Sequence, residues 1–257
     1  MPEFCKTEVD GHILTVTMNR PERMNALHPP ANLELGEIFD DFAANPDLWV
    51  AIITGTGDRA FSAGNDLRWQ AEGNKRPPVP RGFGGLTHRF DLDKPVIAAV
   101  NGVAMGGGFE IALACDIILA SDNAIFALPE PRVGLAALAG GLHRLPREIG
   151  MKRAMGMILT GRRVGAEEGQ TLGFVTDVAP QADLMERARY WAGQICECAP
   201  LSIRASKQVA YAGLNHASLE EAMAAHYDAV TAMAKSEDFV EGPKAFAEKR
   251  PPNWKGR

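Results

Sequence analysis

Two short, continuously apolar segments constrain most strongly what this chain can fold into. Residues 49–54 (Trp-Val-Ala-Ile-Ile-Thr) and residues 95–100 (Pro-Val-Ile-Ala-Ala-Val) are almost free of polar side chains. Such runs are typical of strands in a sheet that is covered on both faces, and helices are the usual cover. We therefore expect an α/β core built around these two strands.

The rest of the chain supplies further strands and the helices. An alternating, β-branched segment at residues 12–19 predicts a strand paired with residues 3–10 across Asp10-Gly11. Residues 73–85 are rich in Gly and Pro and are expected to form a loop. Helical spacing and short apolar runs predict helices over residues 31–44, 107–115, 150–159, 181–198, 200–212, 218–234 and 237–248, and strands near residues 116–120, 124–128 and 173–177. This order predicts an α/β core followed by a helical extension.

Composition excludes several classes of function. The 257 residues carry a formal net charge of -5, so the charge does not favour nucleic acid or an anionic membrane. The N-terminus lacks the apolar stretch of a signal peptide, and no apolar run reaches the roughly 20 residues that a membrane span requires. The four cysteines form no CxxC pair, and no histidines stand at zinc spacing. We expect a cytoplasmic protein without nucleic-acid or membrane partners.

Three successive glycines precede an apolar helix that contains one acid. Gly106-Gly107-Gly108 opens the expected helix, whose first turn carries Glu110. The N–H groups at the start of a helix have no partner within it, and glycine lets a ligand oxygen approach them closely. Close packing of the helix on a sheet would select glycine equally well. On these residues alone, both explanations stay open.

A second glycine turn lies earlier in the chain, at residues 61–67 (Phe-Ser-Ala-Gly-Asn-Asp-Leu). Gly64 permits a tight bend, Asp66 is suited to cap a short helix, and the N–H of Asn65 would then point outward. Two N–H groups that converge form an oxyanion hole, which stabilises negative charge on a carbonyl oxygen. The sequence does not reveal whether the N–H groups of Asn65 and Gly107 converge.

Two acidic residues stand in unusual surroundings. Glu110 is expected in a buried helix, where an unpaired carboxylate is costly and its pKa is raised. The alternative is a glutamate satisfied by the N–H groups of its own helix. Glu130 lies between Pro129 and Pro131, which restrict its backbone and suit a rigidly held catalytic acid. The alternative is a surface turn in which Glu130 pairs with Arg132.

Two weaker patterns point to other functions. Residues 55–60 (Gly-Thr-Gly-Asp-Arg-Ala) follow a strand and match a loose dinucleotide-binding pattern, but no helix is expected directly after them. A plain strand-to-loop connection is the better interpretation. Ser62 stands in Ala-Phe-Ser-Ala-Gly, which lacks the first glycine of a nucleophile elbow and gives little support for a serine hydrolase.

Taken in order along nearly the whole chain, these segments resemble the crotonase (enoyl-CoA hydratase/isomerase) superfamily. The similar segments are residues 18–27, 60–67, 94–102, 106–116, 126–130, 133–135, 160–161, 166–168, 172–175 and 236–242. Each is weak alone, and together they are specific. The resemblance implies an α/β fold, a crotonase-type spiral of ββα units with a helical C-terminal trimerisation region. We expect the acyl-CoA-binding core over residues 1–195 and the helical region over residues 196–257.

The resemblance also implies a site and a reaction. Members of the family hold the carbonyl oxygen of an acyl-CoA thioester between two N–H groups, which correspond to Asn65 and Gly107. Family hydratases use two glutamates, which correspond to Glu110 and Glu130. The implied enzyme is an enoyl-CoA hydratase, a hydro-lyase that adds water reversibly to a 2-enoyl-CoA and gives a 3-hydroxyacyl-CoA. Glu110 would be the water-orienting base and Glu130 the proton donor to Cα. Coenzyme A is part of the substrate, and neither a metal nor another cofactor would be needed.

CoA-binding positions follow from the same resemblance. The CoA portion would cross two segments, and the implied positions are Arg23, Met24, Ala26, Leu27, Ala63, Gly64, Asp66 and Leu67. Phe246 and Lys249, in the last helix, match positions that can approach CoA, sometimes from a neighbouring subunit. The expected assembly is a homotrimer or a homohexamer.

Departures from the family pattern leave the acyl group and the reaction subtype open. They are His28-Pro29-Pro30, the loop at residues 73–85 and residues 134–144, and the loop falls where the family shapes its acyl pocket. The alternative is another crotonase reaction: double-bond isomerisation, carnitinyl-CoA-type dehydration, or hydration followed by retro-aldol cleavage. A crotonase homologue that binds RNA is a rival of another class, and the acidic net charge argues against it.

Overall fold

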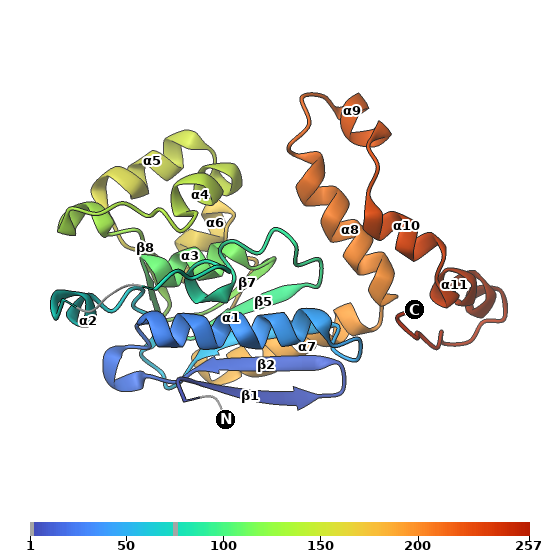
Figure 1. Cartoon of the computed structure of the whole chain (residues 1–257), viewed down its shortest axis with the longest axis horizontal. Coiled ribbons are helices and arrows are strands. Elements are labelled where there is room, and N and C mark those ends of the chain that lie inside the picture. The colour runs from blue at the N-terminus through green and yellow to red at the C-terminus, as the bar shows by residue number, and fades with distance from the viewer. Residues whose placement is uncertain (1–2, 74–76) are drawn as a thin grey trace.

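The computed structural model describes residues 3–73 and 77–257. Within them, six strands form the larger of two sheets, in the spatial order β1-β2-β3-β5-β7-β10 (Figure 1). Their bounds are β1 Cys5–Asp10, β2 Ile13–Met18, β3 Val50–Gly55, β5 Val96–Val100, β7 Ile117–Ser121 and β10 Asp177–Ala179. As expected, β1 and β2 form an antiparallel hairpin, and the other neighbours pair in parallel.

The smaller sheet accounts for the repeated order of elements along the chain. In the described residues it has four strands, ordered β4-β6-β8-β9: β4 Ala60–Ser62, β6 Val103–Met105, β8 Ile125–Ala127 and β9 Val164–Gly165. Strand β3 of the large sheet is followed by β4 of the small sheet and by the helix α2 (Leu67–Ala71). In the same way β5 is followed by β6 and by the helix α3 (Gly107–Ala114). This repeat is the ββα unit that the resemblance implies.

Both faces of the larger sheet are covered, because alternate residues of its central strands point to opposite sides. Ile53 belongs to the buried cluster that includes side chains of α1 (Pro29–Ala44) and α3. Its neighbour Ile52 belongs to a second cluster, formed with α7 (Leu184–Cys196). Both isoleucines are fully buried. The continuously apolar pattern of residues 49–54 is thus explained by helices on two sides of the sheet.

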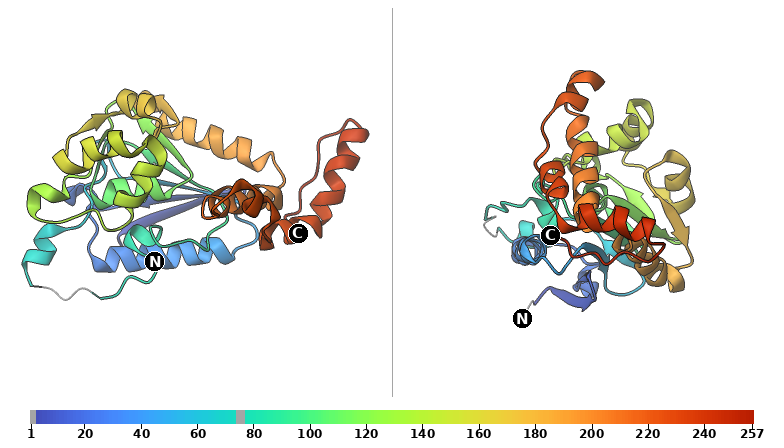
Figure 2. Two further views of the ribbon diagram at one scale, coloured as in Figure 1. Left: turned by 90° about the horizontal axis from the view of Figure 1, so that it is seen from above. Right: turned by 90° about the vertical axis from the view of Figure 1, so that its right-hand side faces the viewer.

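The last part of the chain is helical, as predicted. Helices α8 (Pro200–Gly213), α9 (Leu219–Ala224), α10 (Asp228–Ala234) and α11 (Glu237–Ala247) form an arm that projects from the body of the sheets (Figures 1 and 2). The arm exposes large apolar side chains, among them Leu214, Met223 and Phe246. The division into units at residue 196 stays a prediction. Among the described residues, no helix is both long and apolar enough to cross a membrane.

The remaining elements are short. Two helices lie between β8 and β9 in the chain, α4 Gly141–Ile149 and α5 Met151–Thr160, and α6 Ala166–Leu172 follows β9. Single 3₁₀ turns are η1 Pro21–Arg23, η2 Phe83–Gly85, η3 Glu130–Val133 and η4 Gln181–Asp183. Helices α4 and α6 were not predicted. The 3₁₀ turn η2 forms inside the loop predicted over residues 73–85, of which residues 74–76 lie outside the described residues.

Two predicted elements are corrected by the structure. The single helix predicted over residues 218–234 is broken into α9 and α10, because the backbone is extended at Ala225 and Tyr227. The strand predicted over residues 173–177 begins only at Asp177. Gly173, with φ of 107°, ends α6, and the apolar residues after it are buried in the core instead of pairing in the sheet.

Candidate active site

Helix α3 begins tight against strand β4. A Cβ atom on Gly108 would lie 2.1 Å from the carbonyl oxygen of Ser62, so close packing explains this glycine. Gly107 stands at the first position of the helix, where the N–H has no partner within the helix. Close packing against β4 therefore accounts for Gly108, and the approach of a ligand oxygen stays a prediction for Gly107.

The second glycine turn lies directly beside the start of α3. Gly64 has φ of +85°, and a Cβ atom on it would lie 2.9 Å from the nitrogen of Gly107. The N–H of Leu27 donates to the oxygen of Gly64 (2.8 Å), and the N–H of Asp66 donates to the oxygen of Leu27 (3.0 Å). The N–H of Asn65 stands outside this ladder, and no acceptor within the described ranges takes it or the N–H of Gly107. The glycine turn at Gly64 and the start of α3 at Gly107 are thus neighbours in space, which the sequence alone did not reveal.

Glu110 is buried on α3, with 3% of its surface exposed. Its Oε1 accepts a hydrogen bond at 2.9 Å from the N–H of Gly141, the first residue of α4. The partner is therefore the start of a second helix, and not the N–H groups of its own helix. Burial, together with the charge of Glu130, raises the pKa of Glu110 to about 7, although the N–H of Gly141 opposes the rise. A carboxyl group that titrates near neutrality is suited to acid–base catalysis.

Glu130 approaches the start of α3 from η3. A Cβ atom on Gly106 would lie 2.8 Å from Oε1 of Glu130. Oε2 is buried and has no hydrogen-bond partner in the described part of the chain. Burial raises the pKa of this carboxyl group as well. Arg132 instead donates to the carbonyl oxygen of Thr160 at 2.8 Å, so the alternative of a Glu130–Arg132 surface pair is wrong.

The site thus combines two kinds of group. Two carboxyl groups with raised pKa values lie next to the start of α3, and two N–H groups without acceptors lie there too. N–H groups of this kind can hold a carbonyl oxygen that becomes negative, while the carboxyl groups move protons at the neighbouring carbons.

The segments predicted to contact CoA lie side by side. The N–H of Ala63 donates to the oxygen of Met24 at 2.9 Å, next to the ladder between Leu27 and Gly64. Asp66 pairs with Arg20 at 3.0 Å. Its Oδ1 accepts the N–H of Trp69 at 3.1 Å, which confirms its role as the cap of α2. Of the predicted positions, Ala26, Leu27, Gly64 and Asp66 are buried, Arg23, Met24 and Ala63 are half-buried, and Leu67 is exposed.

Phe246 and Lys249 lie far from these segments within one chain. Phe246 belongs to α11, on the arm, and is 87% exposed, and Lys249 follows at the end of that helix. Figures 1 and 2 place α11 at the opposite end of the molecule from α2, while α3 lies within the body of the sheets. The structure does not bring them to the site, so their contact with CoA stays a prediction that requires a neighbouring copy.

Sequence reasoning missed three residues that shape the site. Gly141 holds Glu110, and its signal was the Gly140-Gly141 pair that opens α4. Asn25 is buried, and its Nδ2 donates to the oxygen of Ala60 at 2.8 Å, which fixes the turn before Ala26. Phe83 packs against Gly107, and no local signal in the loop indicated it.

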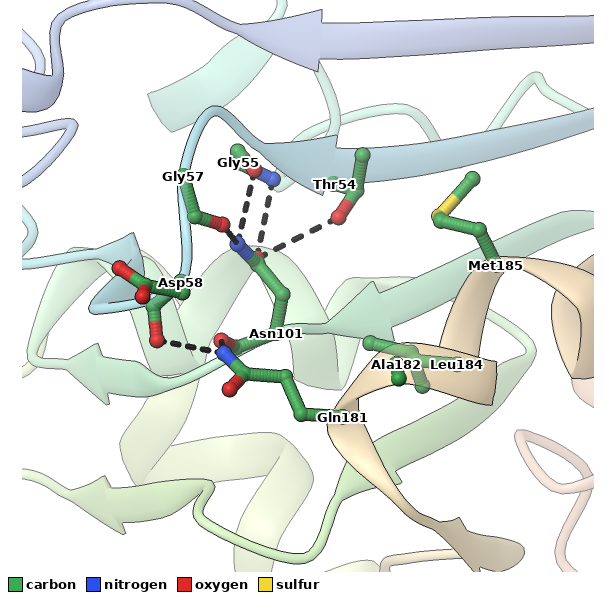
Figure 3. Close-up of a pocket in the computed structure, with 9 residues that line it drawn as sticks. All are labelled: Thr54, Gly55, Gly57, Asp58, Asn101, Gln181, Ala182, Leu184 and Met185. Atoms are coloured by element: carbon green, nitrogen blue, oxygen red, sulfur yellow. Dashed lines mark hydrogen bonds between the residues drawn. The ribbon is translucent and has the colours of Figure 1, made fainter.

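A separate cavity of about 370 Å³ lies beside β3, between Gly55, Asn101 and Met185 (Figure 3). Its amide groups are already satisfied: Nδ2 of Asn101 donates to the oxygen of Gly55 at 2.8 Å, and Nε2 of Gln181 donates to the oxygen of Asp58. After Gly55 the chain continues into β4 and not into a helix, so the weak dinucleotide-binding pattern is not supported.

Known proteins resemble this chain over its whole length. The family model described as enoyl-CoA hydratase/isomerase matches residues 8–257. The carnitinyl-CoA dehydratase of Escherichia coli (strain K12) is 48% identical over 267 residues, an alignment that covers 100% of both chains. The solved enoyl-CoA hydratases of Mycobacterium tuberculosis H37Rv and Mycobacterium marinum are 35% and 37% identical, with a TM-score of 0.93 and 99% of each chain covered in both cases. The fold, the order of motifs and these matches agree, and the chain belongs to the enoyl-CoA hydratase/isomerase family.

Proposed function

We propose that this chain is a hydro-lyase that adds and removes water across C2 and C3 of a CoA thioester. The main support for this proposal is that two carboxyl groups and two N–H groups lie near the start of α3. Glu110 and Glu130 reach it from α3 itself and from η3, and the N–H groups of Asn65 and Gly107 have no acceptor within the described residues. The family membership supports the same reaction.

In the proposed mechanism the thioester oxygen accepts hydrogen bonds from Asn65 and Gly107. Negative charge that develops on this oxygen as the double bond is attacked is stabilised where it forms. Glu110 orients a water molecule and takes its proton as the hydroxyl group bonds to C3. Glu130 delivers a proton to C2, and dehydration is the reverse sequence. The pKa of Glu110, raised to about 7, lets this group exchange protons near neutral pH, and burial raises the pKa of Glu130 as well, which suits a proton donor.

The relatives favour a particular acyl group. Those at 48% identity bear the name carnitinyl-CoA dehydratase, whereas the solved enoyl-CoA hydratases are 35% and 37% identical. Carnitinyl-CoA is a 3-hydroxyacyl thioester with a trimethylammonium group on C4, so its dehydration is the same reaction in reverse. We therefore propose the carnitinyl-CoA-type dehydratase, the alternative to a general enoyl-CoA hydratase, as the first reaction to test.

The proposal extends to binding and assembly. CoA would lie along the paired segments near Leu27 and Gly64, and the reaction would use no metal and no cofactor beyond the CoA of the substrate. The exposed apolar side chains of the arm, such as Leu214 and Phe246, support assembly as a homotrimer or homohexamer. In such an assembly Phe246 and Lys249 could reach the CoA of a neighbouring copy. We retain the cytoplasm as the expected location.

A screen of thioesters tests this function. The purified chain is mixed with but-2-enoyl-CoA, with 4-trimethylammoniobut-2-enoyl-CoA and with carnitinyl-CoA, and absorbance of the conjugated double bond is followed. We expect hydration of the first two and formation of the double bond from the third. Migration of the double bond in a 3-enoyl-CoA, without any reaction of these three thioesters, would identify an isomerase and contradict the proposal.

A further inference from the structure

The ring of Phe83 forms a wall beside the proposed oxyanion hole. A Cβ atom on Gly107 would lie 2.5 Å from Cε1, 2.8 Å from Cζ and 2.9 Å from Cδ1 of this ring. The ring therefore packs directly on Cα of Gly107, the residue whose N–H would hold the thioester oxygen. Any acyl group bound there extends from a point next to the ring.

The ring is held in place by its own turn. The N–H of Phe83 donates to Oγ1 of Thr87 at 2.7 Å, and the N–H of Gly84 donates to Oδ1 of Asn32 on α1 at 2.6 Å. Gly84 has φ of +63°, and a Cβ atom on it would lie 2.4 Å from Cδ1 of Ile111 on α3. The turn is thus fixed between α1 and α3, and the wall is preorganised.

Ion pairs also hold the segment that carries Phe83. Arg89, in the same segment, is buried and pairs with Asp40 of α1 at 2.9 Å and with Asp91 at 3.1 Å. The segment that carries Phe83 is therefore attached to α1 both through amide hydrogen bonds and through charged groups.

The ionisable groups beside this wall are two carboxyl groups and Arg144. Among the described residues, neither Glu110 nor Glu130 forms an ion pair, and Oε2 of Glu130 has no hydrogen-bond partner. Arg144 is the cation that acts electrostatically on Glu110, but its guanidinium donates to the oxygen of Thr87 at 2.9 Å. In the proposed mechanism one carboxyl group of the pair is ionised while the other holds the proton, so a cation on the acyl group would meet one carboxylate that is not in an ion pair within the described residues.

Resting on the proposed function, we propose that Phe83 is a specificity-determining residue that selects acyl groups with a quaternary ammonium on C4. An aromatic face attracts a quaternary ammonium through its quadrupole and packs on its methyl groups. With the C1 oxygen on Gly107, C4 is only three carbons beyond the carbonyl carbon, which keeps its substituent near the start of α3. The ring supplies the cation–π contact, and the ionised member of the glutamate pair supplies the complementary charge.

A matched pair of substrates separates charge from shape. In 4-trimethylammoniobut-2-enoyl-CoA the ammonium nitrogen is replaced by carbon to give 5,5-dimethylhex-2-enoyl-CoA, which has the same shape and no charge. The wild-type chain is expected to prefer the charged thioester by about tenfold or more in kcat/KM. Phe83→Leu keeps an apolar side chain without the aromatic face, and the charged-to-neutral ratio should fall by about fivefold or more. Phe83→Tyr keeps an aromatic ring and should keep the wild-type ratio.

Phe90→Leu is the control, because Phe90 lies in the same segment and is 84% exposed. It should keep the wild-type ratio. Because each variant is compared with itself on two substrates, a general loss of activity does not affect the result. Should Phe83→Leu not fold, Phe83→Met, which also lacks the aromatic face, takes its place in the same comparison. A charged-to-neutral ratio near one in the wild type, or an unchanged ratio in folded Phe83→Leu, overturns the inference about Phe83. If the chain still hydrates but-2-enoyl-CoA, the proposed function is not affected by that result. Absence of any hydration overturns both.

Discussion

Gly141 donates its backbone N–H to Oε1 of Glu110 at 2.9 Å, across 31 residues of sequence. The start of α4 thereby orients a buried carboxyl group on α3. The same N–H lowers a pKa that burial and Glu130 raise. The N–H of Gly141 thus contributes both to the position and to the proton affinity of Glu110.

Removal of this N–H should raise the pKa of Glu110 further. Gly141→Pro and Gly141→Ala both add a Cβ atom, 3.1 Å from Cγ of Glu110, and only proline lacks the N–H. We expect the rise of kcat/KM with pH to move to higher pH in Gly141→Pro than in Gly141→Ala. Circular dichroism confirms that both are folded. Superimposable pH profiles would mean that the hydrogen bond does not tune Glu110.

The pKa of Glu110 also predicts how stability depends on pH. The ordinary value of 4.5 is raised to about 7 in the folded chain, mainly by burial. Between these values the folded state holds a proton that the unfolded chain has released, so this group makes stability fall as pH rises through that range. The full stabilising contribution of the protonated Glu110 is present below pH 4.5 and is lost as the pH rises to about 7.

Glu110→Gln should therefore stabilise the folded chain at alkaline pH. Relative to wild type we expect a gain of about 2 kcal/mol in the free energy of unfolding at pH 8, and a much smaller one at pH 4. Urea unfolding at both pH values measures it. Glu167→Gln, at an exposed position on α6, is the control and should not have this pH-dependent effect. A destabilised Glu110→Gln at pH 8 would argue against a desolvated carboxylate.

The oxyanion hole is tested at Gly107. Gly107→Pro removes the N–H, but its side chain would also meet the ring of Phe83. The substitutions are therefore compared in the background of Phe83→Ala, where Gly107→Ala keeps the donor and Gly107→Pro loses it. We expect kcat to be about 10²-fold or more lower in the proline variant. Equal kcat values in the two folded proteins would remove Gly107 from the mechanism.

Local patterns revealed much of the fold and little of the site geometry. Continuous apolar runs indicated the strands around Ile52 and Ile97, because burial on two faces is a property of the strand itself. The helix cap Asp66 was also predictable, because its hydrogen bond joins residues only three positions apart in the sequence. The break between α9 and α10 was missed, because Ala225 carries no helix-breaking signal and its extended backbone depends on context.

Site residues became predictable through resemblance, and not through residue chemistry. Taken alone, Glu110 and Glu130 each had a purely structural explanation. The structure excludes both explanations, because Glu110 accepts a hydrogen bond from Gly141 of α4. Arg132 donates to Thr160 and does not pair with Glu130. The neighbouring positions of Gly64 and Gly107 are tertiary contacts, which no local periodicity encodes. Phe83 was missed because an apolar residue in a Gly-rich loop gives no sign of the face it covers.

In the proposed mechanism Glu110 and Glu130 act together, on water and on C2. Its most direct test compares hydration of but-2-enoyl-CoA by wild type, Glu110→Gln and Glu130→Gln, with calorimetric binding of the saturated thioester measured alongside. We predict that each substitution lowers kcat by about 10²-fold or more and leaves thioester binding nearly intact, because the lost interactions belong to the transition state. Full hydratase activity in Glu110→Gln would contradict the account.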